Sequence, residues 1–199
     1  MSYIQSVAQV NVQIAEIKGL YNQEIADLCL SWRDKKISND PNATGNEDSR
    51  IPDHQYIDQL KDKVTTIFHA DIDDRYFLSE IWAHVLEDGE TTMIHSHRNP
   101  KDYEQLYLSW VYYPLLPNNM KGGKLVFQMQ EHARTRNFQV TPKTGLFVIF
   151  PSWLPHYTTR NETGGMRLSI SGNCKIREED YVHVHRDRSS GIHKFYGGK

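Results

Sequence analysis

The 199-residue sequence has few cysteines, no excess of charge of one sign and no long apolar run. Its two cysteines, Cys29 and Cys174, make neither a metal-binding pair nor a disulfide framework, and are typical of free thiols in a reducing compartment. The 23 basic and 25 acidic residues give a formal net charge of -2, and neither sign forms a long block. We therefore expect no nucleic-acid partner and no anionic membrane surface.

The absence of a run of about 18 apolar residues excludes a membrane-spanning helix. The N-terminus also lacks the basic start and apolar stretch of a secretion signal. The sequence therefore predicts a cytoplasmic location. The length is sufficient for one domain with a sizeable core.

The first 75 residues indicate helical support with little chemistry. Residues 8–17 alternate in polarity and predict a strand, whereas residues 21–35 and 56–69 carry apolar side chains at helical spacing. The stretch between the two helices, residues 38–53, is rich in Asn, Asp and Ser and predicts a loop, which is a candidate lid.

From Tyr76 the hydrophobic period changes to that of strands. Turn-forming Gly, Pro and Asn residues separate many short apolar segments, a pattern typical of a sandwich or barrel. The charged tail, residues 176–199, is expected to pack loosely. We expect strands at residues 76–86, 92–95, 107–115, 123–130, 145–150, 156–159 and 167–174.

Three histidines in this region form a candidate metal centre. His95 and His97 are two positions apart, so in an extended segment both side chains point to the same face. His156 follows an apolar strand and the segment Pro151-Ser152-Trp153-Leu154-Pro155, whose prolines favour a turn that presents the imidazole. Neutral imidazole is the commonest side-chain metal ligand, so these three residues could hold one ferrous ion with open positions.

Arg167 opens the last expected strand and is a candidate carboxylate-binding residue. It alternates with Ser169 and Ser171, while Leu168 and Ile170 face the other way. A guanidinium on a polar, inward face suits bidentate binding of a carboxylate, and the Ser169 hydroxyl could add a hydrogen bond.

These residues together resemble the 2-oxoglutarate- and Fe(II)-dependent oxygenases, in particular their prolyl-hydroxylase-like subgroup found in bacteria and phages. The resemblance extends from about Trp82 to Asn173. It is carried by His95-Ser96-His97, Ser109-Trp110-Val111-Tyr112-Tyr113, Gly123-Lys124-Leu125-Val126-Phe127, Phe150-Pro151-Ser152-Trp153-Leu154-Pro155-His156 and Arg167-Leu168-Ser169-Ile170-Ser171-Gly172-Asn173.

The resemblance implies a mainly β protein with flanking helices, folded as a double-stranded β-helix, a cupin-like jelly roll. One domain would cover residues 1–199, with helical support over 1–75, the jelly roll over 76–175 and the tail after it. The resemblance makes His95 and His156 iron ligands and Arg167 the residue that binds 2-oxoglutarate, with Ser169 as its partner. Tyr112 or Tyr113, of which we favour Tyr112, would touch the same cosubstrate.

His97 departs from the wider superfamily, whose members mostly carry Asp or Glu at this position. The implied site is therefore formed by three histidines. Asp102 or Glu104 is an alternative carboxylate ligand, and a vacant third position, as in halogenating relatives, is a further alternative.

The implied reaction hydroxylates a substrate with Fe(II), 2-oxoglutarate and O2, releasing succinate and CO2, with ascorbate as a candidate reductant. The substrate would be a peptidyl side chain or a small molecule, and Trp82, Trp153 and Tyr157 are candidate contacts. A bacterial cytosol or that of a phage-infected host would be the location, and a monomer or a homodimer is equally compatible with the sequence. The alternatives are a three-histidine dioxygenase that does not use 2-oxoglutarate and a non-catalytic jelly-roll binding module.

Overall fold

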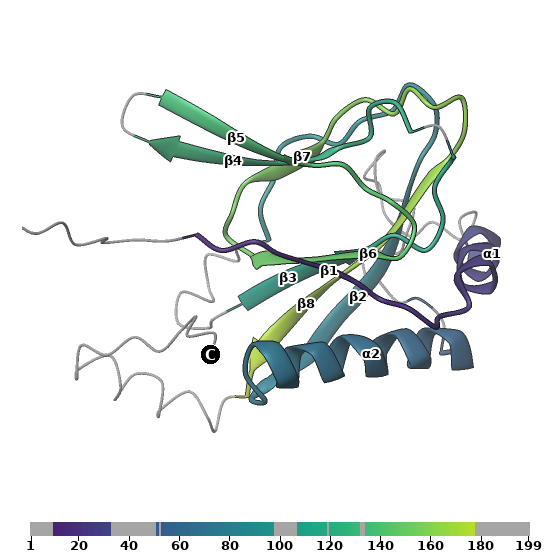
Figure 1. The fold of residues 1–199 in the computed structure, drawn as a ribbon, viewed down its shortest axis with the longest axis vertical. Helices are drawn as coiled ribbons and strands as arrows, with labels where there is room; N and C mark the ends of the chain where they lie inside the picture. The colour runs from purple at the N-terminus through teal and green to yellow at the C-terminus, as the bar shows by residue number, and fades with distance from the viewer. Residues whose placement is uncertain are drawn as a thin grey trace, which may run out of the picture.

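The fold is described from a computed structural model, which describes residues 10–32, 51, 53–97, 107–118, 120–131 and 134–177. Within these ranges it contains two helices and eight strands (Figure 1). They are, in chain order, β1 (Gln13–Glu16), α1 (Asn22–Trp32), α2 (Gln55–Asp71), β2 (Tyr76–Leu86), β3 (Tyr107–Tyr112), β4 (Leu125–Glu131), β5 (Arg134–Val140), β6 (Leu146–Pro151), β7 (His156–Thr158) and β8 (Arg167–Ile176).

The strands form two antiparallel sheets that lie one above the other (Figure 1). The larger sheet has the order β1-β6-β3-β8-β2 and the smaller has the order β5-β4-β7. Helix α2 runs along the outer face of the larger sheet, where its buried side chains Ile57, Leu60, Val64 and Phe68 join the core. This arrangement leaves the inner face of the larger sheet directed at the smaller sheet.

Strand β3 shows how one strand serves two cores. Trp110 and Tyr112 belong to the cluster between sheet and helices, whereas Val111 and Tyr113, the residue after the strand, belong to the cluster between the two sheets. This is the period-two alternation of an extended chain buried on both faces.

A β-bulge in β2 changes which side chains face the inner layer. Leu78 pairs with Cys174, but the next pair is Glu80 with Asn173, so Ser79 is the extra residue. Before the bulge, Tyr76 and Leu78 pack on the helical side; after it, even-numbered residues such as Trp82 line the space between the sheets. The bulge therefore places Glu80, which is exposed, and Trp82 on the same face of β2, and bulges are common beside functional sites.

Most expected elements are present. Both helices and the strands beginning at residues 76, 107, 146, 156 and 167 lie where the sequence predicts them, and β1 occupies the second half of the expected first strand. The expected loop at 38–53 lies almost wholly outside the described residues, as does the tail from residue 178 onward, with Asp102 and Glu104.

Two predictions about strands were wrong. The segment 92–95 is not a strand, because only His95 makes a bridge, to His156, while the Thr92 hydroxyl accepts from the Thr158 amide. Strand β5 was not predicted, because its sequence is polar and exposed along nearly its whole length. Such an edge strand is stabilised by its ladder with β4 and shows no apolar alternation.

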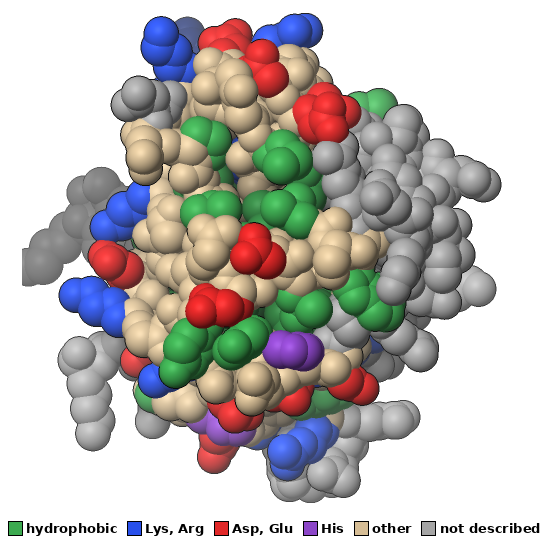
Figure 2. All heavy atoms as spheres, turned by 90° about the vertical axis from the view of Figure 1, so that its right-hand side faces the viewer, with side chains coloured by type: hydrophobic (Ala, Val, Ile, Leu, Met, Phe, Trp, Pro, Cys, Tyr) green, Lys and Arg blue, Asp and Glu red, His purple; other side chains and the backbone are tan. Residues whose placement is uncertain are grey.

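Neither described helix combines the length and hydropathy that a membrane span requires. On the face drawn in Figure 2, acidic and basic side chains are interspersed and do not gather by sign.

Candidate functional site

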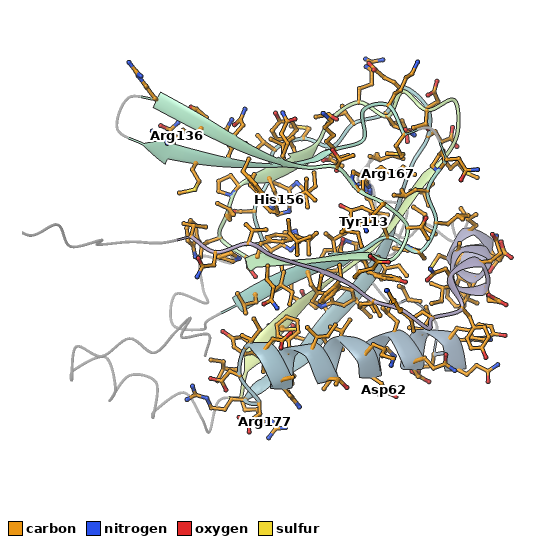
Figure 3. All side chains as sticks on the ribbon, in the orientation of Figure 1. Asp62, Tyr113, Arg136, His156, Arg167 and Arg177 are labelled. Carbon is orange, nitrogen blue, oxygen red and sulfur yellow. The ribbon has the colours of Figure 1, made fainter. Side chains whose placement is uncertain are left out.

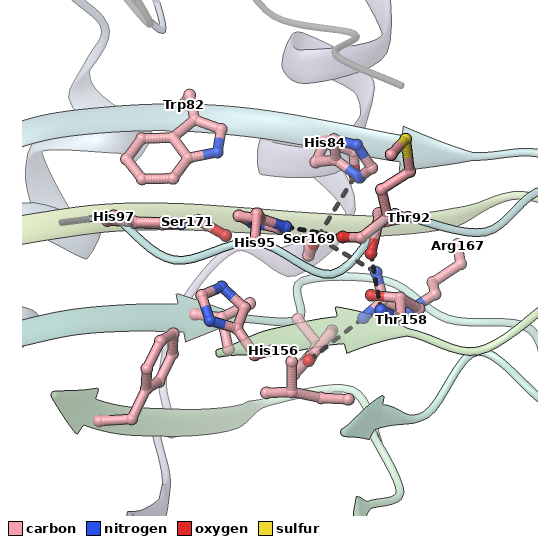
Figure 4. Close-up of a pocket in the computed structure, with 15 residues that line it drawn as sticks. Trp82, His84, Thr92, His95, His97, His156, Thr158, Arg167, Ser169 and Ser171 are labelled. Carbon is pink, nitrogen blue, oxygen red and sulfur yellow. Dashed lines mark hydrogen bonds between the residues drawn. The ribbon is translucent and has the colours of Figure 1, made fainter. Parts of the chain in front are cut away.

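A pocket of about 350 Å³ lies between the two sheets, and most of the candidate site residues line it (Figure 4). Its volume is within the usual range of small-molecule sites. Figure 3 shows His156, Tyr113 and Arg167 between the sheets. The pocket is lined by Trp82, His84, Thr92, Met93, His95, His97, Val111, Tyr113, Leu125, Phe150, His156, Thr158, Arg167, Ser169 and Ser171.

The three predicted histidines converge on one place in this pocket. The backbones of His95 and His156 exchange two hydrogen bonds, of 3.0 and 2.9 Å, and the His97 amide donates to the Ser152 carbonyl at 2.8 Å. The turn after β6 therefore fixes the segment that carries His95 and His97. One ligand atom from each histidine lies within 4.8 Å of the others, so the three residues could hold a metal ion.

Backbone carbonyls orient two of the three imidazoles. His95 Nδ1 lies 2.8 Å from the Met93 carbonyl oxygen, and His156 Nδ1 lies 2.8 Å from that of Leu154. A carbonyl oxygen only accepts, so both Nδ1 atoms carry hydrogen and both Nε2 atoms keep a lone pair. The repeated bond to the residue two positions earlier presents both rings in the tautomer that binds metals through Nε2.

His97 is oriented by side chains. Its Nδ1 lies 2.9 Å from Asn173 Oδ1 and 3.2 Å from Ser109 Oγ. The Asn173 amide nitrogen in turn donates to Glu80 at 2.6 Å.

Burial keeps two of the imidazoles neutral. Desolvation, helped by the nearby His95, lowers the pKa of His156 to about 3. Desolvation also lowers the pKa of His97 below its ordinary value, against the opposing effect of its bond to Asn173. Neutral imidazole is the form that binds metals, so burial prepares the ligands for an ion.

Arg167 lies in the same pocket and is only 2% exposed. Its Nε donates to the Gly123 carbonyl at 2.9 Å, and its Nη atoms donate to Ser169 Oγ at 3.3 Å and to the Tyr113 hydroxyl at 3.2 Å. Among the residues that the structure describes, no Asp or Glu forms an ion pair with it. Burial lowers the pKa of Arg167, and Tyr113 opposes that effect.

The expectation that Arg167 and Ser169 face inward agrees with the structure, but the preference for Tyr112 does not. Tyr112 lies on the opposite face of the sheet, where its hydroxyl donates to Asn22 on α1. Tyr113 lines the pocket and contacts the Arg167 guanidinium with both its hydroxyl and its ring. The sequence indicated two adjacent tyrosines, but it did not show which of the two side chains lies on the pocket face of the sheet.

Gly123 was not predicted as a site residue, and two of the three candidate substrate contacts lie outside the pocket lining. Gly123 adopts a positive φ of 59°, and a Cβ there would lie 3.1 Å from Arg167 Cδ, so a side chain would crowd the guanidinium. Trp82 lines the pocket as expected and lies beside the His97 ring. Trp153 is half exposed and, like Tyr157, is not part of the pocket lining.

Comparison with known proteins agrees with this geometry. The model of the family described as "Putative 2OG-Fe(II) oxygenase" matches residues 80–173, a range that contains all three histidines and Arg167. No curated protein matches the chain.

Solved structures share the fold at low sequence identity. A prolyl hydroxylase from Trichoplax adhaerens, in complex with a hypoxia inducible factor oxygen degradation domain peptide fragment, has a TM-score of 0.57 and 16% identity, covering 86% of each chain. A Pseudomonas putida prolyl-4-hydroxylase has a TM-score of 0.54 and 18% identity, covering 84% of this chain and 94% of that one.

A 2OG-Fe(II) oxygenase family oxidoreductase from Burkholderia pseudomallei matches at a TM-score of 0.41 and 13% identity, and only 56% of its length is covered. The family match, the two-sheet fold shared with the prolyl hydroxylases and the histidine cluster within the matched segment agree with one another. Residues 80–173 therefore match the 2OG-Fe(II) oxygenase family, and the chain shares the double-stranded β-helix fold of the solved prolyl hydroxylases.

Proposed function

We propose that this protein is a 2-oxoglutarate- and Fe(II)-dependent dioxygenase that hydroxylates a peptidyl side chain or a small molecule. In this proposal His95, His97 and His156 bind the iron, and Arg167 binds the distal carboxylate of 2-oxoglutarate. A single domain carries both functions.

The buried guanidinium of Arg167 is the observation that carries the proposal. A buried charge without a counter-ion is costly, so an anionic ligand is the physically expected partner. Within the described residues no carboxylate takes that role, and the pocket that Arg167 shares with the histidines is accessible to a ligand. An anion that also chelates the metal would satisfy both groups at once.

The neighbours of Arg167 support a specific orientation of that anion. The Gly123 carbonyl occupies Nε, which leaves the two Nη atoms, already near Ser169 and Tyr113, as the end that faces the pocket. Both hydroxyls can donate to a carboxylate oxygen while the guanidinium donates to the same group.

The donor set fits Fe(II). Imidazole nitrogen is a suitable ligand for iron, and three ligands leave coordination positions free for a cosubstrate and O2. Bound Fe(II) and 2-oxoglutarate would supply the oxidising chemistry, in which O2 is consumed, succinate and CO2 are released and the substrate gains a hydroxyl group. The protein keeps His97 and His156 neutral, orients the carboxylate and limits access of water.

A peptide is one substrate class that the surroundings favour. Met93 lines the pocket and is 76% exposed, and Trp153, 51% exposed, lies between Ser152, which binds the His97 amide, and Leu154, which orients His156. Such apolar side chains beside an open pocket suit contact with a chain that extends beyond the reacting residue. One of the structurally similar prolyl hydroxylases is in complex with a peptide fragment.

The set of three imidazoles also favours a second candidate, a three-histidine dioxygenase that does not use 2-oxoglutarate. Arg167 would then bind the carboxylate of the substrate. The two candidates differ in whether succinate is formed.

The test is succinate formation by purified protein supplied with Fe(II), 2-oxoglutarate and O2. Enzymes of this kind consume some cosubstrate without a prime substrate, so the assay does not require the substrate to be known. We expect slow succinate formation by the wild type and none by His156→Ala, because the variant removes a ligand. Equal succinate formation by both proteins would exclude the proposed iron site, and iron-dependent O2 consumption without succinate would favour the second candidate.

A further inference from the structure

His97 differs from the other two histidines in what orients it. Backbone carbonyls accept from His95 and His156, whereas His97 Nδ1 faces the side chain of Asn173 at 2.9 Å. Asn173 is 7% exposed and its amide nitrogen lies 2.6 Å from a carboxylate oxygen of Glu80. A chain of two hydrogen bonds thus runs from Glu80 through Asn173 to His97.

The carboxylate fixes the direction of every bond in this chain. An ionised carboxylate only accepts, so the NH2 group of Asn173 must face Glu80 and its oxygen must face His97. That oxygen only accepts, so His97 Nδ1 must carry the hydrogen. Nε2 of His97 is then left with a lone pair, in the same tautomer as the other two imidazoles.

Ser109 strengthens the assignment of the amide. Its hydroxyl lies 2.7 Å from the same Asn173 oxygen and 2.8 Å from Ser152 Oγ, inside a fully buried part of the sheet. The amide oxygen therefore faces two donor groups, and the amide nitrogen faces an acceptor. A flipped amide would place its NH2 group against His97 and Ser109 and its oxygen against a carboxylate.

The backbone is shaped to bring Glu80 to this place. The bulge at Ser79 makes Glu80, and not Ser79, the cross-strand partner of Asn173, so both side chains project to the same face. Gly172 permits the close approach of β8 to β2, because a Cβ there would lie 2.5 Å from the Glu80 carbonyl oxygen. These are local departures from a regular ladder, and both act at Glu80 and Asn173.

We propose that Glu80 and Asn173 are positioning residues that hold His97 in its metal-binding tautomer and place a negative charge two hydrogen bonds from the imidazole that binds the ion. The inference rests on the proposed function, in which His97 binds iron. Three imidazoles bring no charge to a divalent ion, and Glu80 supplies, at a distance, part of what a directly bound carboxylate would supply. Hydrogen bonds to the far nitrogen of a ligating histidine raise its basicity and fix its orientation.

The first arm of the test reads the tautomer of His97 by NMR of 15N-histidine-labelled, metal-free protein at pH 7.5. The wild type should show His97 protonated on Nδ1, and Glu80→Gln should show a mixture of the two tautomers, because the amide of Asn173 is then free to flip. A role of Glu80 in stability alone would leave the tautomer unchanged. An unchanged tautomer in a folded Glu80→Gln protein would overturn the inference.

The second arm measures affinity for Co(II) by its visible absorption. Glu80→Gln should weaken Co(II) binding about tenfold, the lower end of the effect of such partners on metal affinity. The matched control is Glu16→Gln, which removes a carboxylate from β1 of the same sheet, where it pairs with Lys143, and should leave Co(II) affinity unchanged. Equal affinity of Glu80→Gln and the control would also overturn the inference.

A double variant tests the direction of the chain. The double variant Glu80→Gln/Asn173→Asp places the carboxylate at position 173 and an amide at position 80. The carboxylate can then accept directly from His97 Nδ1 and from the glutamine amide. It should restore a single Nδ1-protonated tautomer and at least wild-type Co(II) affinity, and failure to restore either in a folded protein would contradict the proposal. Because the tautomer is read without metal, a wild type that binds no Co(II) would refute the proposed function and still leave the tautomer arm decisive.

Discussion

At the scale of single residues, the site is a buried cation and three imidazole rings within one pocket. Arg167 donates hydrogen bonds to Gly123, Ser169 and Tyr113, but its charge has no acidic partner in the described part of the chain. Burial removes the charge from His156 and His97 at neutral pH. One half of the pocket therefore suits an anion and the other half a cation.

Adjacent tyrosines allow a matched test of the anion site. Tyr113→Phe removes a hydroxyl that lies 3.2 Å from the guanidinium, and we expect it to weaken 2-oxoglutarate binding about fivefold to tenfold, corresponding to roughly 1 kcal/mol for one hydrogen bond. Tyr112→Phe removes the bond to Asn22 on the other face of β3 and should leave that affinity unchanged. Calorimetric titration of the metal-loaded proteins with 2-oxoglutarate measures both, and the reverse order of effects would restore Tyr112 to the site.

At the scale of the elements, β8 is the strand on which the site depends. It pairs with both β2 and β3, so Arg167, Ser169, Ser171 and Asn173 all reach the inner face from one strand. Gly172 lies among them on the other face, against Trp110 and the backbone of Glu80.

Gly172→Ala should show how tightly this strand is packed. The added Cβ would lie 2.5 Å from both the Trp110 ring and the Glu80 carbonyl oxygen, so the sheet must shift, and we expect a loss of about 1–3 kcal/mol in the free energy of unfolding. Gly165→Ala is the control, because its Cβ would meet no atom closer than Pro117 Cγ at 3.4 Å. Urea denaturation of both variants measures the difference, and equal stability would mean that β8 approaches its neighbours less closely than described.

The elements also show what the sequence could and could not predict. Short apolar segments between turn-forming residues located β2, β3, β6 and β8, because both faces of these strands are packed or lined by functional side chains. Strand β5 was not predicted, because it is held by backbone hydrogen bonds to β4 and its exposed side chains show no hydrophobic pattern. The sequence also did not predict the bulge in β2, which makes Glu80 the cross-strand partner of Asn173.

The metal-binding and carboxylate-binding residues of the candidate site could be predicted from residue type and spacing. The parts of the site that depend on tertiary geometry could not. Three histidines and an arginine at matching positions along strands indicated a metal and a carboxylate. The choice between Tyr112 and Tyr113 depended on where β3 begins its alternation, which depends on tertiary packing. The side-chain partners of His97 come from two other strands, 12 and 76 residues away in sequence.

At the scale of the whole molecule, the buried histidines link folding to pH. An unfolded histidine has a pKa near 6.5, whereas that of His156 is about 3 in the fold. Between these values the unfolded chain binds more protons than the folded one, so stability should be full above about pH 6.5 and fall as the pH is lowered toward 3.

We therefore expect the metal-free protein to lose stability on acidification, by about 1.4 kcal/mol per pH unit for each histidine that takes up a full proton only on unfolding. His156→Gln should reduce this dependence, because it removes one of the titrating groups. Thermal unfolding between pH 4 and 7.5 measures the effect. The same dependence in wild type and variant would show that His156 is not held neutral by the fold.

The central claim is that one pocket holds a metal through three histidines and a carboxylate through Arg167. Its most direct measurement is an anaerobic titration of the Fe(II)-loaded protein with 2-oxoglutarate, followed by the visible charge-transfer absorption of the chelate, in wild type, Arg167→Met and the exposed control Arg134→Ala. We predict saturation at one 2-oxoglutarate per chain in wild type and control, and at least about 30-fold weaker binding in Arg167→Met, since removing one partner of a buried charge pair costs about 2 kcal/mol or more. Arg167→Met should remain as stable as the wild type without cosubstrate, because it removes a buried charge that lacks a counter-ion. Equal affinity in all three proteins, or no absorption in a wild type that binds iron, would contradict the account.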